Sequence, residues 1–195
     1  MPGRIYTRTG DKGMTGVAGG GRVDKDDPRM AAMGDLDEAN ATLGYLRAKL
    51  PVDHDWQPGL HRIQKEWMDA MGHLAKPSDV DKPRHVPLPE ESAKWAEEWM
   101  DAIEASLESA TEYFLLPGGN EVSALCHMIR TQIRRAERSL VTLYKHDPGP
   151  QCILEYVNRL SDLFFKLARQ EMARSSIEED RWQLFRYNRK AGKGE

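Results

Sequence analysis

The sequence predicts an all-α protein, an antiparallel bundle of five helices preceded by an N-terminal arm rich in glycine and threonine. Apolar residues recur every three or four positions through five segments. Breaks that contain proline or glycine separate these segments. No segment shows the two-residue alternation that is typical of strands, and no internal repeat is present. We therefore expect a single domain, with the arm over residues 1–27, the bundle over 28–172 and a polar tail over 173–195.

The positions of the five helices follow from their apolar stripes and from the residues that end them. The stripes cover residues 30–50, 60–74, 95–107, 122–143 and 153–168. Pro51 stops the first stripe and Pro77 closes the second, because proline cannot continue the backbone hydrogen bonds of a helix. Asn120 is a suitable N-cap for the fourth stripe, which is the most regular.

Composition argues against several classes of protein. The chain of 195 residues has 28 basic and 31 acidic residues and a net charge of -3, so no overall positive field attracts nucleic acid. It has no apolar run of about 18 residues and no leader pattern, so we expect a cytoplasmic protein without membrane contact. The histidines lack metal-type spacing, and Cys126 and Cys152 are interpreted as buried thiols. We expect no structural metal.

The arm contains the first candidate for a binding site. Residues 7–16, TRTGDKGMTG, combine the glycines, hydroxyls and cations of a backbone nest that donates N–H groups to phosphate oxygens. Lys25 adds a further cation nearby. The segment matches neither the Walker A loop nor the glycine fingerprint of dinucleotide-binding folds. A nucleotide phosphate is the natural ligand, although a flexible turn can have the same composition.

The fourth helix carries the second candidate. Its charged residues at positions i, i+4, i+7 and i+8 lie on one side beside the apolar stripe; they are Arg130, Arg134, Glu137 and Arg138. Guanidinium groups suit triphosphate oxygens, and a carboxylate can orient an arginine or help to hold Mg²⁺. A solvated face with internal salt bridges is the alternative interpretation. On the fifth helix, Asn158 is placed either to contact a ribose or base, or to pair inside the bundle.

Several separated segments, taken in order, resemble one known family. They are IYTRTGDKG (5–13), RVDK (22–25), DLDEAN (35–40), FLLPGG (114–119), RTQIRRAER (130–138) and NRLSD (158–162). In that order they resemble the PduO-type ATP:cob(I)alamin adenosyltransferases over nearly the whole chain. The resemblance implies transfer of the 5′-deoxyadenosyl group of ATP to the cobalt of reduced cobalamin, with release of triphosphate. It also implies a homotrimer of five-helix bundles with ATP at each subunit interface.

The resemblance further implies roles for the matching positions. The arm residues expected to wrap the triphosphate are Thr7, Arg8, Thr9, Gly10, Thr15, Gly16 and Lys25. Those expected to complete the ATP and Mg²⁺ site are Arg134, Arg135, Glu137 and Arg138, with Asn158 at the nucleoside. Asp37 and Arg130 would form a salt bridge between subunits that positions the corrinoid, and Phe114 would lie against the lower face of the corrin ring. The expected catalytic residues are thus Arg134, Arg130, Asp37 and Phe114.

Two other functions remain open at this point. The first is a carrier that binds a nucleotide or corrinoid without catalysis and loads a client enzyme. The second is a helical module whose arginine face binds an acidic partner or RNA. If the chain is the transferase, its expected partners are a flavoprotein reductase that supplies the electron and a client enzyme that depends on adenosylcobalamin.

Overall fold

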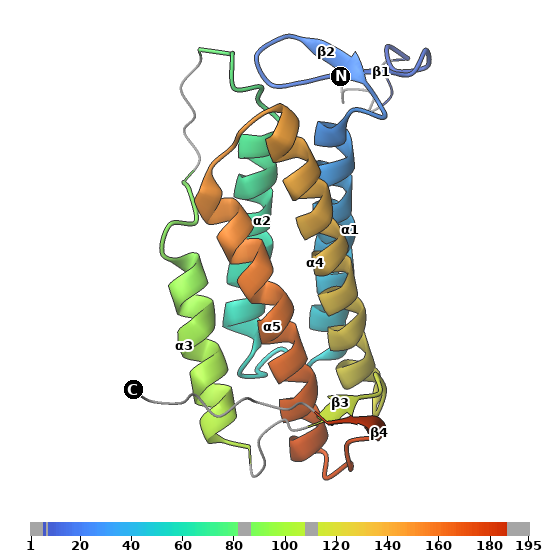
Figure 1. Ribbon diagram of the computed structural model, residues 1–195, viewed down its shortest axis with the longest axis vertical. Helices are drawn as coiled ribbons and strands as arrows, with labels where there is room; N and C mark the ends of the chain where they lie inside the picture. Colours follow the sequence, from blue (N-terminus) through green and yellow to red (C-terminus); the bar gives the residue numbers. More distant parts are fainter. Residues whose placement is uncertain (1–5, 7, 82–86, 108–112, 187–195) are drawn as a thin grey trace.

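The computed structural model describes residues 6, 8–81, 87–107 and 113–186, and within them it confirms the predicted all-α bundle (Figure 1). The described residues form the helices α1 (Pro28–Lys49), α2 (Gln57–Leu74), α3 (Ser92–Ala105), α4 (Glu121–His146) and α5 (Gln151–Arg174). Within the same ranges, no helix is both long enough and apolar enough to cross a lipid bilayer.

Local chemistry at the helix ends explains where α1 and α4 begin. The Asp27 side chain accepts a hydrogen bond of 2.8 Å from the Arg29 N–H, and Pro28 occupies the first turn of α1. At α4 the Asn120 side chain accepts a hydrogen bond of 2.9 Å from the Ser123 N–H, as its sequence position predicted. Each cap satisfies an N–H group that has no partner within its own helix.

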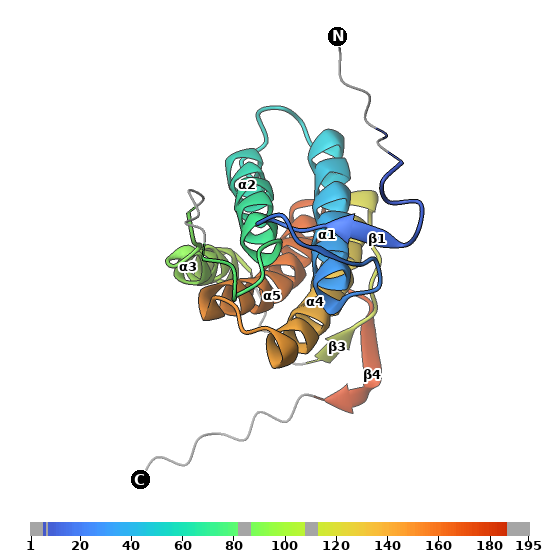
Figure 2. The ribbon, with the colours of Figure 1, turned by 90° about the horizontal axis from the view of Figure 1, so that it is seen from above.

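The apolar stripes meet in one core. Figure 2 shows α1, α2, α4 and α5 grouped together, with α3 lying outside against α5. Fully buried side chains from the four grouped helices include Leu36, Trp67, Ile133 and Phe164. Burying one such side chain stabilises the fold by about 1.5 to 3 kcal/mol, so the stripes supply the main driving force. Trp67 belongs to this core, while Trp95 and Trp99 pack against its edge.

The described residues also contain four short strands that the sequence analysis did not predict. Strand β1 (Met14–Gly16) pairs antiparallel with β2 (Arg22–Asp24), so the arm folds back as a hairpin. Strand β3 (Tyr113–Leu115) pairs antiparallel with β4 (Arg181–Arg186), which lies within the segment expected to be a polar tail. Three of these strands are only three residues long, too short to show an alternating pattern.

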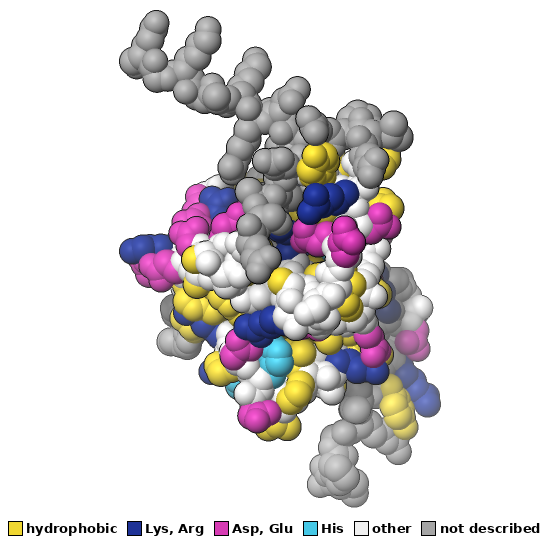
Figure 3. Space-filling model, turned by 90° about the horizontal axis from the view of Figure 1, so that it is seen from below, with side chains coloured by type: hydrophobic (Ala, Val, Ile, Leu, Met, Phe, Trp, Pro, Cys, Tyr) yellow, Lys and Arg dark blue, Asp and Glu magenta, His cyan; other side chains and the backbone are white. Residues whose placement is uncertain are grey.

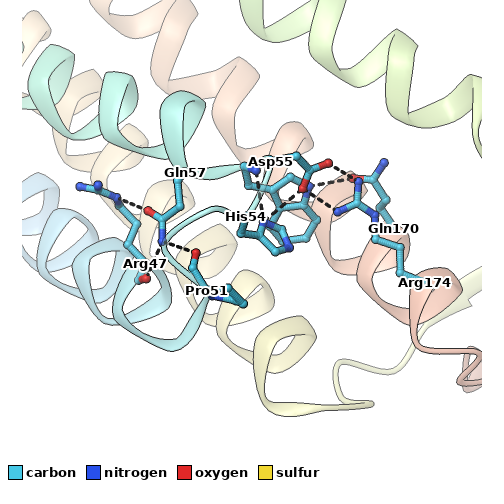
Figure 4. A network of polar contacts seen from close by, with 8 residues as sticks. Arg47, Pro51, His54, Asp55, Gln57, Gln170 and Arg174 are labelled. Carbon is cyan, nitrogen blue, oxygen red and sulfur yellow. Dashed lines mark hydrogen bonds and ion pairs between the residues drawn. The ribbon is translucent and has the colours of Figure 1, made fainter.

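The two strand pairs lie at opposite ends of the bundle. The β1–β2 hairpin lies beside the start of α1, and β3 and β4 lie at the other end, where α4 begins and α5 ends (Figure 1). A polar network near this second end joins the α1–α2 connection to α5 (Figure 4). In it Arg174 donates two hydrogen bonds, of 2.9 and 2.6 Å, to Asp55, and the Trp56 indole N–H donates to Gln170 at 3.0 Å.

Candidate active site

The arm forms a loop held by the Arg22 side chain and by the Lys25 backbone. The Arg22 guanidinium donates hydrogen bonds to the Thr9 and Met14 carbonyls, at 2.6 and 3.1 Å, and the Lys25 backbone N–H donates to the Gly13 carbonyl at 2.8 Å. Thr15 lies within β1, opposite Val23. The described part of the arm therefore forms a hydrogen-bonded loop and hairpin. Arg22 had no predicted role, and only its hydrogen bonds in the folded arm reveal one.

Lys25 and Gly10, both predicted phosphate-site residues, come together in this loop. A Cβ added to Gly10 would lie 3.3 Å from the Lys25 Nζ, so the absence of a side chain lets the ammonium approach the loop backbone. Arg8 adopts a positive φ of 60°, a conformation that non-glycine residues rarely adopt and that marks a constrained loop. Thr7 lies outside the described residues, while the predicted Thr9 and Gly16 lie in the hairpin and its loop.

On α4 and α5 the structure joins two of the predicted residues. The Asn158 side-chain amide donates a 2.7 Å hydrogen bond to the Glu137 carboxylate, and Arg159 donates a 3.1 Å bond to the Asn158 amide oxygen. Arg138 reaches back to the Arg134 carbonyl at 3.0 Å. The guanidinium groups of Arg134 and Arg138 belong to exposed residues, so they can receive a ligand from solvent.

Asp162 joins the same cluster, although the sequence analysis assigned it no role. Burial raises the pKa of its carboxyl group, while the charges of Arg159 and Arg134 act in the opposite direction and Glu137 raises it further. The cluster thus combines several guanidinium groups with a carboxyl group that ionises less readily than usual. Such perturbed groups concentrate at functional sites, although structural ion pairs also produce them.

Arg135 has a different environment from the one expected of an ATP ligand. Its guanidinium donates a 2.9 Å hydrogen bond to Asp35 and pairs with Glu38, both on α1 of the same chain. The Ser139 hydroxyl also donates to Asp35, at 2.5 Å. In this structure Arg135 therefore connects α4 to α1, and its side chain is turned away from Glu137 and Asn158.

Arg130 and Asp37 are not paired with each other in the described chain. Among the described residues, the Arg130 Nε is buried and has no hydrogen-bond partner. Burial lowers the pKa of its guanidinium, and the neighbouring charge of Arg134 lowers it further. Asp37 is exposed on α1. A buried guanidinium nitrogen without an acceptor costs free energy, so an acceptor bound at the Arg130 Nε would stabilise the protein.

Phe114 lies on β3, at the end of the bundle opposite the arm. Its side chain is 48% exposed, and it is paired in register with Trp182 of β4, which is 44% exposed. Seen from below, this end of the molecule shows hydrophobic side chains among charged ones (Figure 3). Exposed aromatic residues on paired strands offer apolar surface to a large planar ligand.

Known proteins resemble this chain over most of its length. A family model described as cobalamin adenosyltransferase matches residues 5–171. The chain is 42% identical over 177 residues to the corrinoid adenosyltransferase of Bacillus subtilis, and the match covers 89% of each chain. It is 44% identical over 170 residues to the corrinoid adenosyltransferase of Mycobacterium tuberculosis, covering 85% of this chain and 87% of that one.

Solved structures show the same fold. One is a variant of a PduO-type ATP:corrinoid adenosyltransferase from Lactobacillus reuteri complexed with cobalamin and ATP, with a TM-score of 0.87 and 32% identity over 92% of this chain and 99% of that chain. Another variant of the L. reuteri protein, complexed with ATP, has a TM-score of 0.86 and 32% identity, covering 92% of this chain and all of that one.

Proposed function

The chain belongs to the cobalamin adenosyltransferase family, whose reaction is ATP-dependent adenosyl transfer to cobalamin, and we propose that it carries out this transfer along α4, between the arm hairpin and β3. The observation that carries the proposal is the order of the candidate residues along that helix. Arg130 lies nearer β3 and Arg138 nearer the arm, and the two are eight positions apart, a rise of about 12 Å.

This order matches the shape of the two substrates. The triphosphate of ATP lies toward the arm, where loop N–H groups, Lys25, Arg134 and Arg138 supply positive charge. The nucleoside lies toward Asn158, and the corrin ring lies on Phe114 at the β3 end. The C5′ atom then falls between the phosphate cluster and the cobalt, as the transfer requires.

The chemistry explains why cations and not a general base make up the site. Reduced cobalt, Co(I), supplies the electron pair of the new Co–C bond to C5′ of ATP. The C5′–O bond breaks at the same time, and its electron pair leaves with triphosphate. The protein therefore has to align the two reactants and stabilise negative charge on the leaving group, which Arg134, Arg138 and Lys25 are suited to do.

Mg²⁺ fits this site as a companion of the triphosphate. No group of three or more histidine, cysteine, aspartate or glutamate residues in the described chain could hold a metal by itself. Mg²⁺ is commonly bound by one or two carboxylates together with substrate phosphates. Glu137, whose carboxylate already faces Asn158, is the protein ligand that we assign, and the ion would neutralise charge on the leaving triphosphate.

Phe114 has a second proposed role, in the reduction that precedes transfer. An aromatic ring against the lower face of the corrin would exclude water and an axial base from the cobalt. Loss of that lower ligand stabilises Co(I) relative to Co(II), which makes the reduction by a flavoprotein partner easier. We expect Phe114→Ala to slow turnover that starts from Co(II) much more than turnover from chemically prepared Co(I), and equal effects on both would contradict this role.

A second copy of the chain would complete the site. The buried Arg130 Nε lacks an acceptor among the described residues, and the exposed Asp37 is available to a neighbour. We propose that Asp37 of one subunit pairs with Arg130 of the next in a cytoplasmic homotrimer. The product would then pass to a client enzyme that uses adenosylcobalamin. Sedimentation of the wild-type protein and of Asp37→Ala tests the assembly, which the substitution should weaken.

The deciding experiment is anaerobic incubation of the purified protein with ATP, Mg²⁺ and chemically reduced cobalamin. We expect loss of the Co(I) absorption band and formation of light-sensitive adenosylcobalamin together with triphosphate. Arg134→Ala should lower kcat by about 10²- to 10³-fold, the usual effect of removing one donor from a developing negative charge. The matched control is Arg62→Ala, which removes an arginine on α2 that pairs with Glu66 and lies outside the proposed site.

The possible outcomes separate the candidate functions. Equal losses of kcat in the Arg134 and Arg62 variants would contradict the proposal that Arg134 binds the phosphates. Tight binding of ATP and corrinoid without triphosphate release would indicate a carrier. Binding that depends strongly on salt and that ATP does not inhibit would indicate the interaction module instead.

A further inference from the structure

A half-open cavity of about 110 Å³ lies behind β3, and nothing in the proposed transfer mechanism uses it. We call it the β3 cavity. Its walls come from Leu115 and Leu116, the turn at residues 117–119, the first turns of α4, the end of α5 and residues 178–180. Leu116 lies two residues beyond Phe114, about 7 Å along an extended chain. The cavity is therefore next to the surface on which the corrin ring is proposed to lie.

Two residues of the β3 cavity wall carry buried polar atoms that are unpaired in the described chain. Ser123 is completely buried and His127 is 7% exposed, and both belong to the cavity wall. Neither the Ser123 Oγ nor the His127 Nδ1 has a hydrogen-bond partner within the described part of the chain. The two residues are four positions apart on α4, so they lie on the same face of the helix. A buried polar atom left unpaired costs about 1 to 3 kcal/mol, so this pair of atoms favours a polar ligand.

The charges around the cavity restrict which ligand fits. Glu178, Glu179 and Asp180 belong to the wall and bring negative charge to it, which disfavours an anion. The cation in the wall, Arg169, donates hydrogen bonds of 2.5 and 3.3 Å to Glu179. Burial lowers the pKa of His127 to about 4, with a further contribution from Arg130, so its imidazole is neutral near pH 7. The site therefore suits a neutral group.

A primary carboxamide meets these requirements. It both donates and accepts hydrogen bonds, and so do a serine hydroxyl and the two nitrogens of a neutral imidazole. The corrin ring carries acetamide and propionamide side chains around its edge, so the proposed substrate brings such groups to the mouth of the cavity. Solvent water meets the same hydrogen-bonding requirement, which makes it the alternative occupant that an experiment has to exclude.

We propose that the β3 cavity receives one carboxamide side chain of the corrin ring, bound by Ser123 Oγ and His127 Nδ1, and that this contact sets the rotation of the ring on Phe114. The inference rests on the proposed function, because it places the corrinoid at β3. It makes Ser123 and His127 specificity-determining residues. It also predicts that the protein distinguishes the several side chains of the ring, which a flat apolar surface by itself does not do.

The test uses cobalamin derivatives in which a single ring carboxamide has been hydrolysed to a carboxylate, each derivative altered at a different side chain. Dissociation constants are measured in the presence of ATP from the change in the corrinoid absorption spectrum. In the wild-type protein we expect one derivative to bind at least about tenfold more weakly than the others, because its carboxylate meets the acidic wall. The Ser123→Ala, His127→Leu double variant should bind cobalamin more weakly and should lose this discrimination.

The control is Trp67→Phe, which removes another buried N–H without a partner in the described chain, at a core residue that is not part of the cavity wall. It should keep the wild-type discrimination. Thermal unfolding checks that each variant is folded. If the double variant is not, Ser123→Ala alone is compared, and its discrimination should fall while its affinity for ATP stays unchanged.

Each other outcome overturns the inference in a recognisable way. Equal binding of all derivatives by the wild-type protein would mean that water alone fills the cavity, and the proposed function would stand. Discrimination that survives in the folded variants would place the selective contact elsewhere. Failure of the wild-type protein to bind any corrinoid would overturn both the inference and the proposed function.

Discussion

Arg29 joins three helices at the arm end of the bundle, and replacing it tests how that end is held. It lies in the first turn of α1 and is 5% exposed. Its guanidinium donates hydrogen bonds to the Leu74 carbonyl at the end of α2, to the Lys76 carbonyl at 3.1 Å, and to Asp147 just after α4. Burial by itself would raise the pKa of Asp147, but hydrogen bonds from Ser78 and Arg29 lower it overall.

The expected magnitude follows from these contacts. Breaking a buried ion pair by removing one partner costs about 3 to 5 kcal/mol. Here the Asp147 side chain is 20% exposed and keeps hydrogen bonds of 3.2 and 3.3 Å from the Ser78 N–H, which reduces the loss. The Leu74 and Lys76 carbonyls each lose a hydrogen-bond donor, which increases the loss of stability. We expect Arg29→Met to lower the free energy of unfolding by about 3 to 4 kcal/mol, or Tm by about 7 to 14 °C.

The matched control is Arg174→Met, which removes the exposed ion pair shown in Figure 4. The Asp55 side chain is 61% exposed, so this pair should contribute at most about 1 kcal/mol. Urea unfolding followed by circular dichroism measures both variants. A loss below about 1 kcal/mol for Arg29→Met, or equal losses in the two variants, would refute the reasoning that burial makes the Arg29 contacts important.

Three further predictions concern the β3 end. Gly119→Ala should destabilise by about 2 to 4 kcal/mol in urea unfolding, because φ is 93° and an added Cβ would lie 1.9 Å from the Met172 Sδ; an unchanged midpoint would contradict this. Asn120→Ala should cost about 1 to 2 kcal/mol, because it removes the α4 cap and a 2.6 Å bond to Glu171, and a smaller loss would show the cap to be dispensable. Folding lowers the pKa of His127 from 6.5 to about 4. The contribution of His127 to the free energy of unfolding is therefore complete above pH 6.5 and decreases as pH falls, by about 2 kcal/mol at pH 5. His127→Gln should flatten that part of the pH profile of unfolding, and an unchanged profile would mean that His127 titrates normally.

Much of the fold was predictable from the sequence because helix formation is largely local. The apolar stripes and their proline breaks located all the helices of the described chain, and Asn120 was identified as a cap from its position alone. The motifs in the arm and on α4 also indicated a nucleotide phosphate site. Family resemblance was needed to add the corrinoid, because no local pattern around Phe114 specifies a planar ligand.

Other features were not predictable, because they depend on contacts between residues far apart in the chain. Phe114 pairs with Trp182 across 68 positions, and strands this short leave no periodic signal. Arg135 belongs to the same charged run as Arg134, yet only the packing of α4 on α1 shows that Asp35 and Glu38 bind it. In a helix, residues one position apart point in directions about 100° apart, so neighbours in sequence can serve different purposes.

The sequence by itself thus determined the helices, the single bundle and the chemical character of the candidate site, since these depend on periodicity and residue type. Tertiary structure decided which charges are free to bind a ligand, as the exposed Arg134 is, and which are committed to partners, as Arg29 is. It alone revealed the β3 cavity with its unpaired Ser123 and His127 atoms. The physical reason is that whether a polar atom has a partner depends on the groups that folding brings within hydrogen-bond distance, and sequence spacing does not record those distances.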